Sequence, residues 1–137
     1  MSYRVGSGID FHQLKKGREL WIGGIKIPHT KGALGHSDAD VLLHAICDAL
    51  LGALCLGDIG VHFPNTDASY KNIDSKVLLS ETMKLIKKQG YGIVNIDTTL
   101  CLQEPMIKPY TEKMGFVGRE EGVVAYATVL LAKVLSV

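Results

Sequence analysis

The sequence predicts one α/β (α+β) domain, with helices packed on one face of a mixed β-sheet of about four strands. Two observations support this fold class. Segments with strand and helix patterns alternate through most of the chain, and neither an internal repeat nor a low-complexity tract interrupts them. The chain has 137 residues, of which 47% are hydrophobic, so residues 1–137 suffice for a single domain with a buried core.

The longest apolar segment predicts a helix that begins with Ser37 as its N-cap and ends at Gly57. Its side chains are apolar on nearly all sides, which is typical of a buried helix. His44 lies within it, with Asp40 and Asp48 one turn away on either side. This polar stripe has two interpretations. It is a solvated stripe on a half-buried helix, or it is a metal ligand whose second shell is formed by the carboxylates.

The remaining segments predict the elements around that helix. They are a strand at Tyr3–His12, a hairpin at Glu19–Pro28, a helix from Asp74 or Ser75 to about Gln89, and strands at Tyr91–Leu102 and Val123–Val137. A buried helix fits the last segment nearly as well as a strand. Met106–Tyr110 could begin a further helix. Residues 15–18, 29–35 and 58–67 predict loops.

Composition excludes several classes of protein. The net charge is +1 and the basic residues are scattered, so no nucleic-acid-binding face is evident. Cys47, Cys55 and Cys101 form no CxxC pair and are typical of core residues in a reducing compartment. No signal peptide precedes the first strand, and the late apolar run from residue 123 to 135 is too short to span a bilayer. We therefore expect a cytoplasmic protein with neither nucleic-acid nor membrane partners.

Asp10 and His12 are two residues apart on the first predicted strand, so their side chains point to the same face. With His44 they would give two imidazoles and one carboxylate with a free fourth position, which suits zinc better than calcium or magnesium. The alternative is two polar residues at a fraying strand end. The spacing does not show that the strand and the helix meet. The nearby Gly6-Ser7-Gly8 lacks the third glycine of a phosphate-binding loop.

Several motifs follow one another in register along nearly the whole chain. They are Gly8-x-Asp10-x-His12, Gly23-Gly24-x-x-Ile27-Pro28, His36-Ser37-Asp38-x-Asp40-x-x-x-His44, Asp48-Ala49-Leu50-Leu51-Gly52-Ala53, Asp58-Ile59-Gly60, Phe63-Pro64-x-Thr66-Asp67, Glu112-Lys113-Met114-Gly115-Phe116 and Gly118-Arg119-x-Glu121-Gly122. Together they resemble the 2-C-methyl-D-erythritol 2,4-cyclodiphosphate synthase family of the non-mevalonate isoprenoid pathway.

The resemblance implies a phosphorus–oxygen lyase. Such an enzyme converts 4-diphosphocytidyl-2-C-methyl-D-erythritol 2-phosphate to the cyclic diphosphate and releases CMP. The substrate's 2-phosphate attacks its own β-phosphate, so the reaction needs no protein nucleophile. This agrees with the sequence, where no activated serine or cysteine constellation is evident. Catalysis then depends on positioning and charge neutralisation.

The resemblance also implies roles for individual residues. Asp10, His12 and His44 would hold Zn²⁺, and Glu112 a second ion, Mg²⁺ or Mn²⁺. His36 would lie near the transferring phosphate. The implied substrate contacts are Asp10, His12, His36, Ser37, Asp58, Ile59, Gly60, Phe63, Pro64, Asn65, Thr66, Asp67, Leu102, Gln103, Glu104, Pro105, Met106, Ile107, Lys108, Thr111, Glu112, Phe116 and Arg119.

Within that set, Asp58 and Gly60 would contact the erythritol hydroxyls, residues 63–67 would form a flexible loop over that pocket, and residues 102–108 a cytidine-binding turn. The family forms homotrimers with active sites between subunits. Phe116, Arg119 and Glu121 match residues around a central cavity that can hold an isoprenoid diphosphate.

The chain departs from the family pattern at three places. Asn65 replaces an aspartate of the loop motif FPDTD, and the turn after Pro105 lacks an expected lysine. A helix, the start of a strand and a Thr-Thr pair are absent between Tyr110 and Thr111. We hypothesise that a segment is missing there. Two other functions remain open: a zinc phosphoesterase that uses metal-activated water, and an inactive homologue that binds isoprenoid diphosphate.

Overall fold

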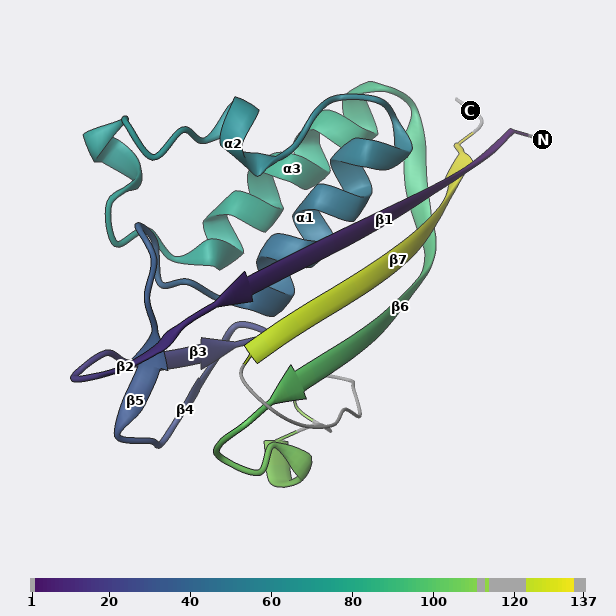
Figure 1. Cartoon of the computed structure of the whole chain (residues 1–137). Coiled ribbons are helices and arrows are strands. Elements are labelled where there is room, and N and C mark those ends of the chain that lie inside the picture. Colours follow the sequence, from purple (N-terminus) through teal and green to yellow (C-terminus); the bar gives the residue numbers. More distant parts are fainter. Residues whose placement is uncertain (1, 111–112, 114–122, 135–137) are drawn as a thin grey trace.

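The computed structural model describes residues 2–110, 113 and 123–134. They form an α+β domain in which helices cover one face of a sheet (Figure 1). In chain order the elements are β1 (Tyr3–His12), β2 (Leu14–Lys16), β3 (Leu20–Ile22), β4 (Ile25–Ile27), β5 (Lys31–Ala33), α1 (Val41–Ala53), α2 (Ile59–His62), η1 (Ala68–Tyr70), α3 (Ser75–Lys88), β6 (Tyr91–Leu102), η2 (Lys108–Tyr110) and β7 (Val123–Lys133).

The main sheet has the order β1-β7-β6 and is antiparallel at both pairings. The expectation of a mixed sheet of about four strands is therefore wrong for the described residues. Hydrophobic patterns do not encode strand direction, and antiparallel neighbours need no crossover helix. The short strands pair separately, β2 with β5 and β3 with β4, and β2 and β5 occupy segments for which loops were predicted.

The predicted last strand is confirmed over the described residues as β7, the centre of the sheet. Its alternate residues Ala125, Ala127, Val129 and Leu131 are fully buried beneath the helices. Tyr126, which points to the other face, is 46% exposed. Burial of every second residue is the pattern of a strand that is covered on one face, and it distinguishes this segment from the buried helix that its sequence also allowed.

Helix α1 is shorter than predicted. It begins at Val41 with Asp40 as its N-cap, rather than at Ser37, and ends at Ala53, well before Gly57. Ala39 and Cys55 have positive φ values of 55° and 56°, which a right-handed helix does not accommodate. These two residues flank the helix, so the backbone leaves the helical conformation on both sides.

Asp40 is fully buried, and its carboxylate accepts hydrogen bonds from backbone N–H groups. Its carboxylate accepts N–H bonds from Gly23 at 2.9 Å, Gly24 at 2.7 Å and Leu43 at 3.1 Å. It thus caps α1 and ties the β3–β4 hairpin to it. The interpretation of Asp40 as part of a stripe around His44 is wrong, because its oxygens face the hairpin. Burial raises the pKa of this carboxyl, and the backbone N–H groups oppose that rise.

Glycines of β1 let α1 lie directly on the strand backbone. A Cβ on Gly8 would stand 2.0 Å from the Ala45 carbonyl oxygen, and one on Gly6 would stand 2.0 Å from that of Ala49. Such distances exclude any side chain at either position. The Gly-Ser-Gly run therefore serves close packing between strand and helix, and this packing brings the polar end of β1 beside His44.

The other elements agree with the prediction in part. Helix α3 begins after its N-cap Asp74 and ends before Gln89, as expected. The predicted loop over residues 58–67 contains the short helix α2, and the helix expected from Met106 is a single 3₁₀ turn, η2. Within the described ranges, no helix is long and apolar enough to cross a bilayer.

Candidate metal centre and its pocket

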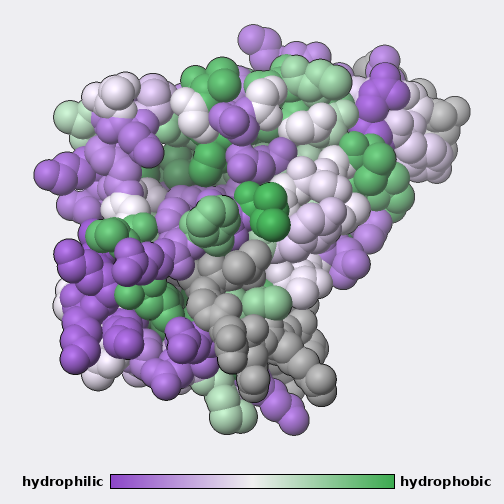
Figure 2. Space-filling model, viewed as in Figure 1, coloured by the Kyte–Doolittle hydropathy of each residue, from purple (hydrophilic) through white to green (hydrophobic). Residues whose placement is uncertain are grey.

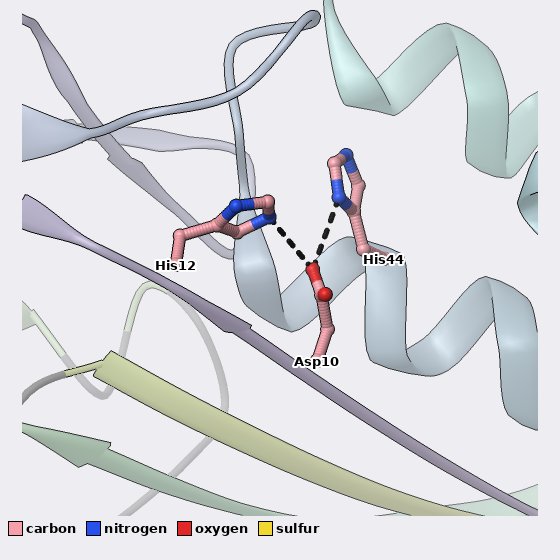
Figure 3. A group of neighbouring side chains, drawn as sticks. All are labelled: Asp10, His12 and His44. Carbon is pink, nitrogen blue, oxygen red and sulfur yellow. Dashed lines mark hydrogen bonds and ion pairs between the residues drawn. The ribbon is translucent and has the colours of Figure 1, made fainter. Parts of the chain in front are cut away.

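Three predicted ligands converge where β1 passes α1 (Figure 3). Nε2 of His12 lies 2.9 Å from Oδ2 of Asp10, and Nδ1 of His44 lies 3.2 Å from the same oxygen. One ligand atom from each residue lies within 4.8 Å of the other two. The strand and the helix therefore meet, which the spacing alone could not show.

The outward-facing nitrogens of both imidazoles have oxygen partners. Nδ1 of His12 lies 3.0 Å from the carbonyl oxygen of Leu34, to which it can only donate. Nε2 of His44 lies 3.1 Å from Oγ of Ser37 and 2.8 Å from Oγ of Ser75. Imidazoles that ligate metals commonly have such a partner at the second nitrogen.

The atoms that face one another fit a divalent cation. Because Nδ1 of neutral His12 donates to Leu34, its Nε2 presents a lone pair toward the Asp10 carboxylate. That buried Nε2 makes no aligned hydrogen bond with any group in the described part of the chain. Two nitrogen acceptors and one carboxylate oxygen need a positive charge between them. Asp10, His12 and His44 could hold such an ion and leave a further position open.

A pocket of about 280 Å³ opens beside this group. Its lining includes predicted site residues from four parts of the chain: Asp10, His12, His36, Ser37, His44, Ile59, Gly60, Phe63 and Asn65. The lining also includes residues that the sequence did not single out: Leu34, Gly35, Tyr70, Ile73 and Leu78. Leu34, Ile73 and Leu78 are apolar and Gly35 has no side chain, so these four carry no chemical signature in the sequence, and Tyr70 belongs to none of the predicted motifs.

The comparisons with known proteins agree with this architecture. The model of the YgbB family matches residues 3–114. The chain belongs to the YgbB family. This membership confirms the resemblance that the motifs indicated.

Named relatives of this YgbB chain cover almost all of it. The 2-C-methyl-D-erythritol 2,4-cyclodiphosphate synthase of Bacteroides thetaiotaomicron is 52% identical over 158 aligned residues, covering 97% of this chain and 99% of the relative. A solved structure of 2C-methyl-D-erythritol-2,4-cyclodiphosphate synthase matches with a TM-score of 0.85 and 35% identity, covering 94% of this chain and 100% of that chain. A CDP-bound structure of a synthase of that name matches with a TM-score of 0.80 and 32% identity, covering 94% and 99%.

Other predicted contacts of the YgbB chain lie outside the lining of this pocket. Asp58 caps α2 by accepting the N–H of Val61 at 3.0 Å. Asp67 caps η1 by accepting the N–H of Ser69 at 2.9 Å, and hydrogen bonds from Ser69 lower the pKa of this carboxyl. Pro64 and Thr66 also lie outside the lining. His36 remains close to this segment, with Nε2 3.3 Å from the Asp67 carbonyl oxygen.

The predicted cytidine turn, residues 102–108, lies apart from that pocket. Gln103 and Glu104 line a second pocket of about 340 Å³ together with His12. Leu102 and Ile107 are buried, whereas Met106 is 79% exposed. His12 lines both pockets, so the turn lies near the metal group but at a different pocket from the one that His36 and Ser37 line. The remaining predicted residues, Thr111, Glu112, Phe116, Arg119 and Glu121, lie outside the described residues.

The metal group has perturbed pKa values. Burial alone would raise the pKa of Asp10, but the adjacent imidazoles of His12 and His44, which favour the carboxylate when they are protonated, outweigh it and lower that pKa to about 2. Burial alone would lower the pKa of His12, and the Asp10 carboxylate reverses this and raises it. The pair therefore favours Asp⁻ with His⁺ in the metal-free chain.

We expect the metal-free chain to be most stable between the ordinary pKa values of the pair, 3.8 and 6.5. The raised pKa of His12 adds stability below 6.5, and this contribution is lost as the pH rises through the raised value. The lowered pKa of Asp10 adds stability above 3.8, and this contribution is lost as the pH falls toward about 2. The unfolding temperature of chelator-treated protein against pH measures both limits.

Asp10→Asn is the control for that profile. Without the carboxylate, His12 loses the partner that raises its pKa, so the decline in unfolding temperature above pH 6.5 should flatten. A metal-free wild type whose unfolding temperature stays constant or rises above pH 6.5 would contradict the assignment of the pair.

Proposed function

We propose that this chain converts 4-diphosphocytidyl-2-C-methyl-D-erythritol 2-phosphate to 2-C-methyl-D-erythritol 2,4-cyclodiphosphate and CMP, as a phosphorus–oxygen lyase of non-mevalonate isoprenoid biosynthesis. The observation that carries the proposal is the convergence of Asp10, His12 and His44 at the wall of a pocket in a YgbB chain. The names of the full-length relatives and the CDP-bound structure support the substrate class.

The proposed cofactor at the three converging ligands is Zn²⁺. Two imidazole nitrogens and one carboxylate oxygen with an open position are typical of catalytic zinc sites. When bound there, the ion supplies Lewis-acid polarisation of a phosphoryl oxygen. The protein fixes the ligands before the substrate arrives, through Leu34 at His12 and two serines at His44. We also propose Mg²⁺ or Mn²⁺ at Glu112.

The pocket residues would position the substrate so that its two phosphates react with each other. His36 and Ser37 follow β5 and line the pocket together with the metal group and residues 59, 60 and 63. Holding reacting groups in this way supplies much of the rate of an intramolecular transfer. Asn65 lines the pocket where the family pattern has a carboxylate, so it adds no negative charge facing an anionic substrate.

We propose a homotrimer with active sites between subunits. The sheet face away from the helices is apolar at its β1 edge: Val5 is 66% exposed, Ile9 60% and Phe11 74%. Figure 2 shows separate hydrophobic side chains at the surface along the diagonal that β1 and β7 follow in Figure 1, with near-neutral side chains between them. An uncovered apolar sheet face supports assembly. The predicted substrate contacts line two separate pockets of one subunit, which supports active sites that neighbouring subunits share. Phe116 and Arg119 would line a central cavity for an isoprenoid diphosphate.

We further propose that a segment is missing between Tyr110 and Thr111 and that the protein is cytoplasmic. The alignment with the Bacteroides relative covers 158 positions, more than the 137 residues of this chain, which supports the missing segment. Its Thr-Thr pair would complete the site, together with Thr111 and Glu112. Intact-protein mass spectrometry tests the segment, and a mass equal to 14.9 kDa would contradict it. Three free cysteines support a reducing compartment.

Product analysis tests the proposed reaction. The chain, supplied with zinc and magnesium, should release CMP and a cyclic diphosphate in equal amounts from the diphosphocytidyl substrate. Inorganic phosphate without a cyclic product would instead show a zinc phosphoesterase. No turnover combined with binding of an isoprenoid diphosphate would favour the inactive homologue.

A further inference from the structure

Ser75 is a buried hydroxyl that no motif singled out. It is the first residue of α3 and is 0% exposed. Its Oγ lies 2.8 Å from Nε2 of His44, closer than the Oγ of Ser37 at 3.1 Å. The contact joins α3 to the one proposed metal ligand that comes from α1.

The direction of this hydrogen bond follows from the surroundings of Ser75. Its hydroxyl has a single proton, which it donates to Oδ1 of Asp38. The same Asp38 carboxylate also accepts the backbone N–H groups of Ser75 at 2.9 Å and Asp40 at 3.0 Å. Because a carboxylate offers only lone pairs, the Ser75 proton stays on the Asp38 side. The Ser75 oxygen is therefore an acceptor toward His44.

An acceptor at Nε2 decides where the lone pair of His44 lies. Nε2 must carry the ring proton to make the 2.8 Å bond, so in the neutral ring Nδ1 keeps the lone pair. Nδ1 is the nitrogen that faces Asp10 at 3.2 Å. Ser37 does not impose this choice: its oxygen already accepts the N–H of Ala39 at 3.1 Å, and its own proton could turn toward His44.

We propose that Ser75, oriented by Asp38, is a positioning residue that fixes the His44 ring with its proton on Nε2 and its ligating lone pair on Nδ1. This inference rests on the proposed metal site and deepens it. It names the residues that prepare one ligand before the ion binds. Asp10 alone would attract a proton to Nδ1, which is the wrong nitrogen for a ligand, and Ser75 opposes that preference.

Two measurements test the proposal. In a metal-free wild-type chain labelled with ¹⁵N at histidine, at a pH at which the His44 ring is neutral, we expect the ring proton on Nε2, with slow exchange against water because Ser75 accepts it. Competition with a chromophoric chelator should show that Ser75→Ala weakens zinc affinity about 10- to 100-fold, as expected for removal of a second-shell partner. The Nε2 proton of that variant should exchange faster.

Thr82→Ala is the matched control. Thr82 is a 0% exposed hydroxyl residue on the same helix, two turns after Ser75, and is neither in the metal group nor in the lining of its pocket. It should keep the zinc affinity and the protected His44 proton of the wild type. A loss of affinity equal to that of Ser75→Ala would show a general effect of truncating α3 and would overturn the proposal.

The wild-type spectrum decides the question even if Ser75→Ala does not fold. A metal-free chain whose neutral His44 ring carries its proton on Nδ1 overturns the proposal, as does a folded Ser75→Ala chain with unchanged affinity and proton exchange. Both outcomes leave zinc binding by Asp10, His12 and His44 intact once the metal is added, so the proposed function stands. A wild type that binds no zinc overturns the metal site of the proposed function, and this inference with it.

Discussion

His44→Ala is expected to abolish stoichiometric zinc binding and to lower CMP formation by on the order of a thousandfold or more. The change removes one of the three ligands that converge in the described part of the chain and leaves Asp10 and His12 as an incomplete set. The imidazole ring lies between Ser37 and Ser75, and both of its contacts there are made by side chains, so its removal leaves the backbone hydrogen bonds of α1 in place. Metal analysis of the purified variant and a CMP release assay measure the two effects.

His62→Ala is the control for a general effect of losing a histidine. Its Nε2 lies 2.7 Å from the Leu56 carbonyl oxygen, and it is not among the residues that line the metal-side pocket. This variant should bind zinc as the wild type does. If His44→Ala kept full metal content and turnover, both zinc-dependent functions would be wrong.

Gly8→Ala is expected to destabilise the fold by about 3 kcal/mol or more, since overpacking commonly costs about 1–3 kcal/mol and here the obstacle is backbone. The new Cβ would stand 2.0 Å from the Ala45 carbonyl oxygen and 2.8 Å from the Ala49 nitrogen. Because those atoms belong to the central helix, α1 must move away from β1. We expect a drop in unfolding temperature of roughly 10 °C or more and weaker zinc binding.

Gly52→Ala separates that clash from the general effect of replacing a glycine. Gly52 lies within α1, and a Cβ there would meet no atom within 4 Å in the described chain. Alanine in an exposed helix position should stabilise by about 0.5–1 kcal/mol. An unfolding temperature for Gly8→Ala equal to that of the wild type would contradict the close packing of β1 on α1.

The sequence predicts most elements because their patterns are local. Alternation finds Tyr3–His12 and Tyr91–Leu102 with the bounds that the structure has, and Asp74 and Gly90 mark the ends of α3. The short sheet of β2 and β5 has no such pattern, since three-residue strands show no period. The start of α1 was misplaced because Ser37 has a typical capping side chain, while the left-handed backbone at Ala39 leaves no sequence signal.

The candidate site was predictable where residue type and period sufficed. Asp10 and His12 share a strand face, and His44 is unusual in an apolar helix, so all three could be chosen before the structure. Their convergence depends on Gly8, whose role appears only when α1 is seen against β1. Ser75 could not be found, because one serine at the start of a helix is ordinarily read as a cap.

Anomalous scattering at the zinc edge from crystals grown with zinc tests most directly whether Asp10, His12 and His44 hold one ion between them. If the three side chains share one ion, one strong peak should lie about 2.0–2.2 Å from Nε2 of His12, Nδ1 of His44 and a carboxylate oxygen of Asp10, the usual range for these ligands. Crystals that contain zinc but show no peak shared by these three side chains would contradict the shared site.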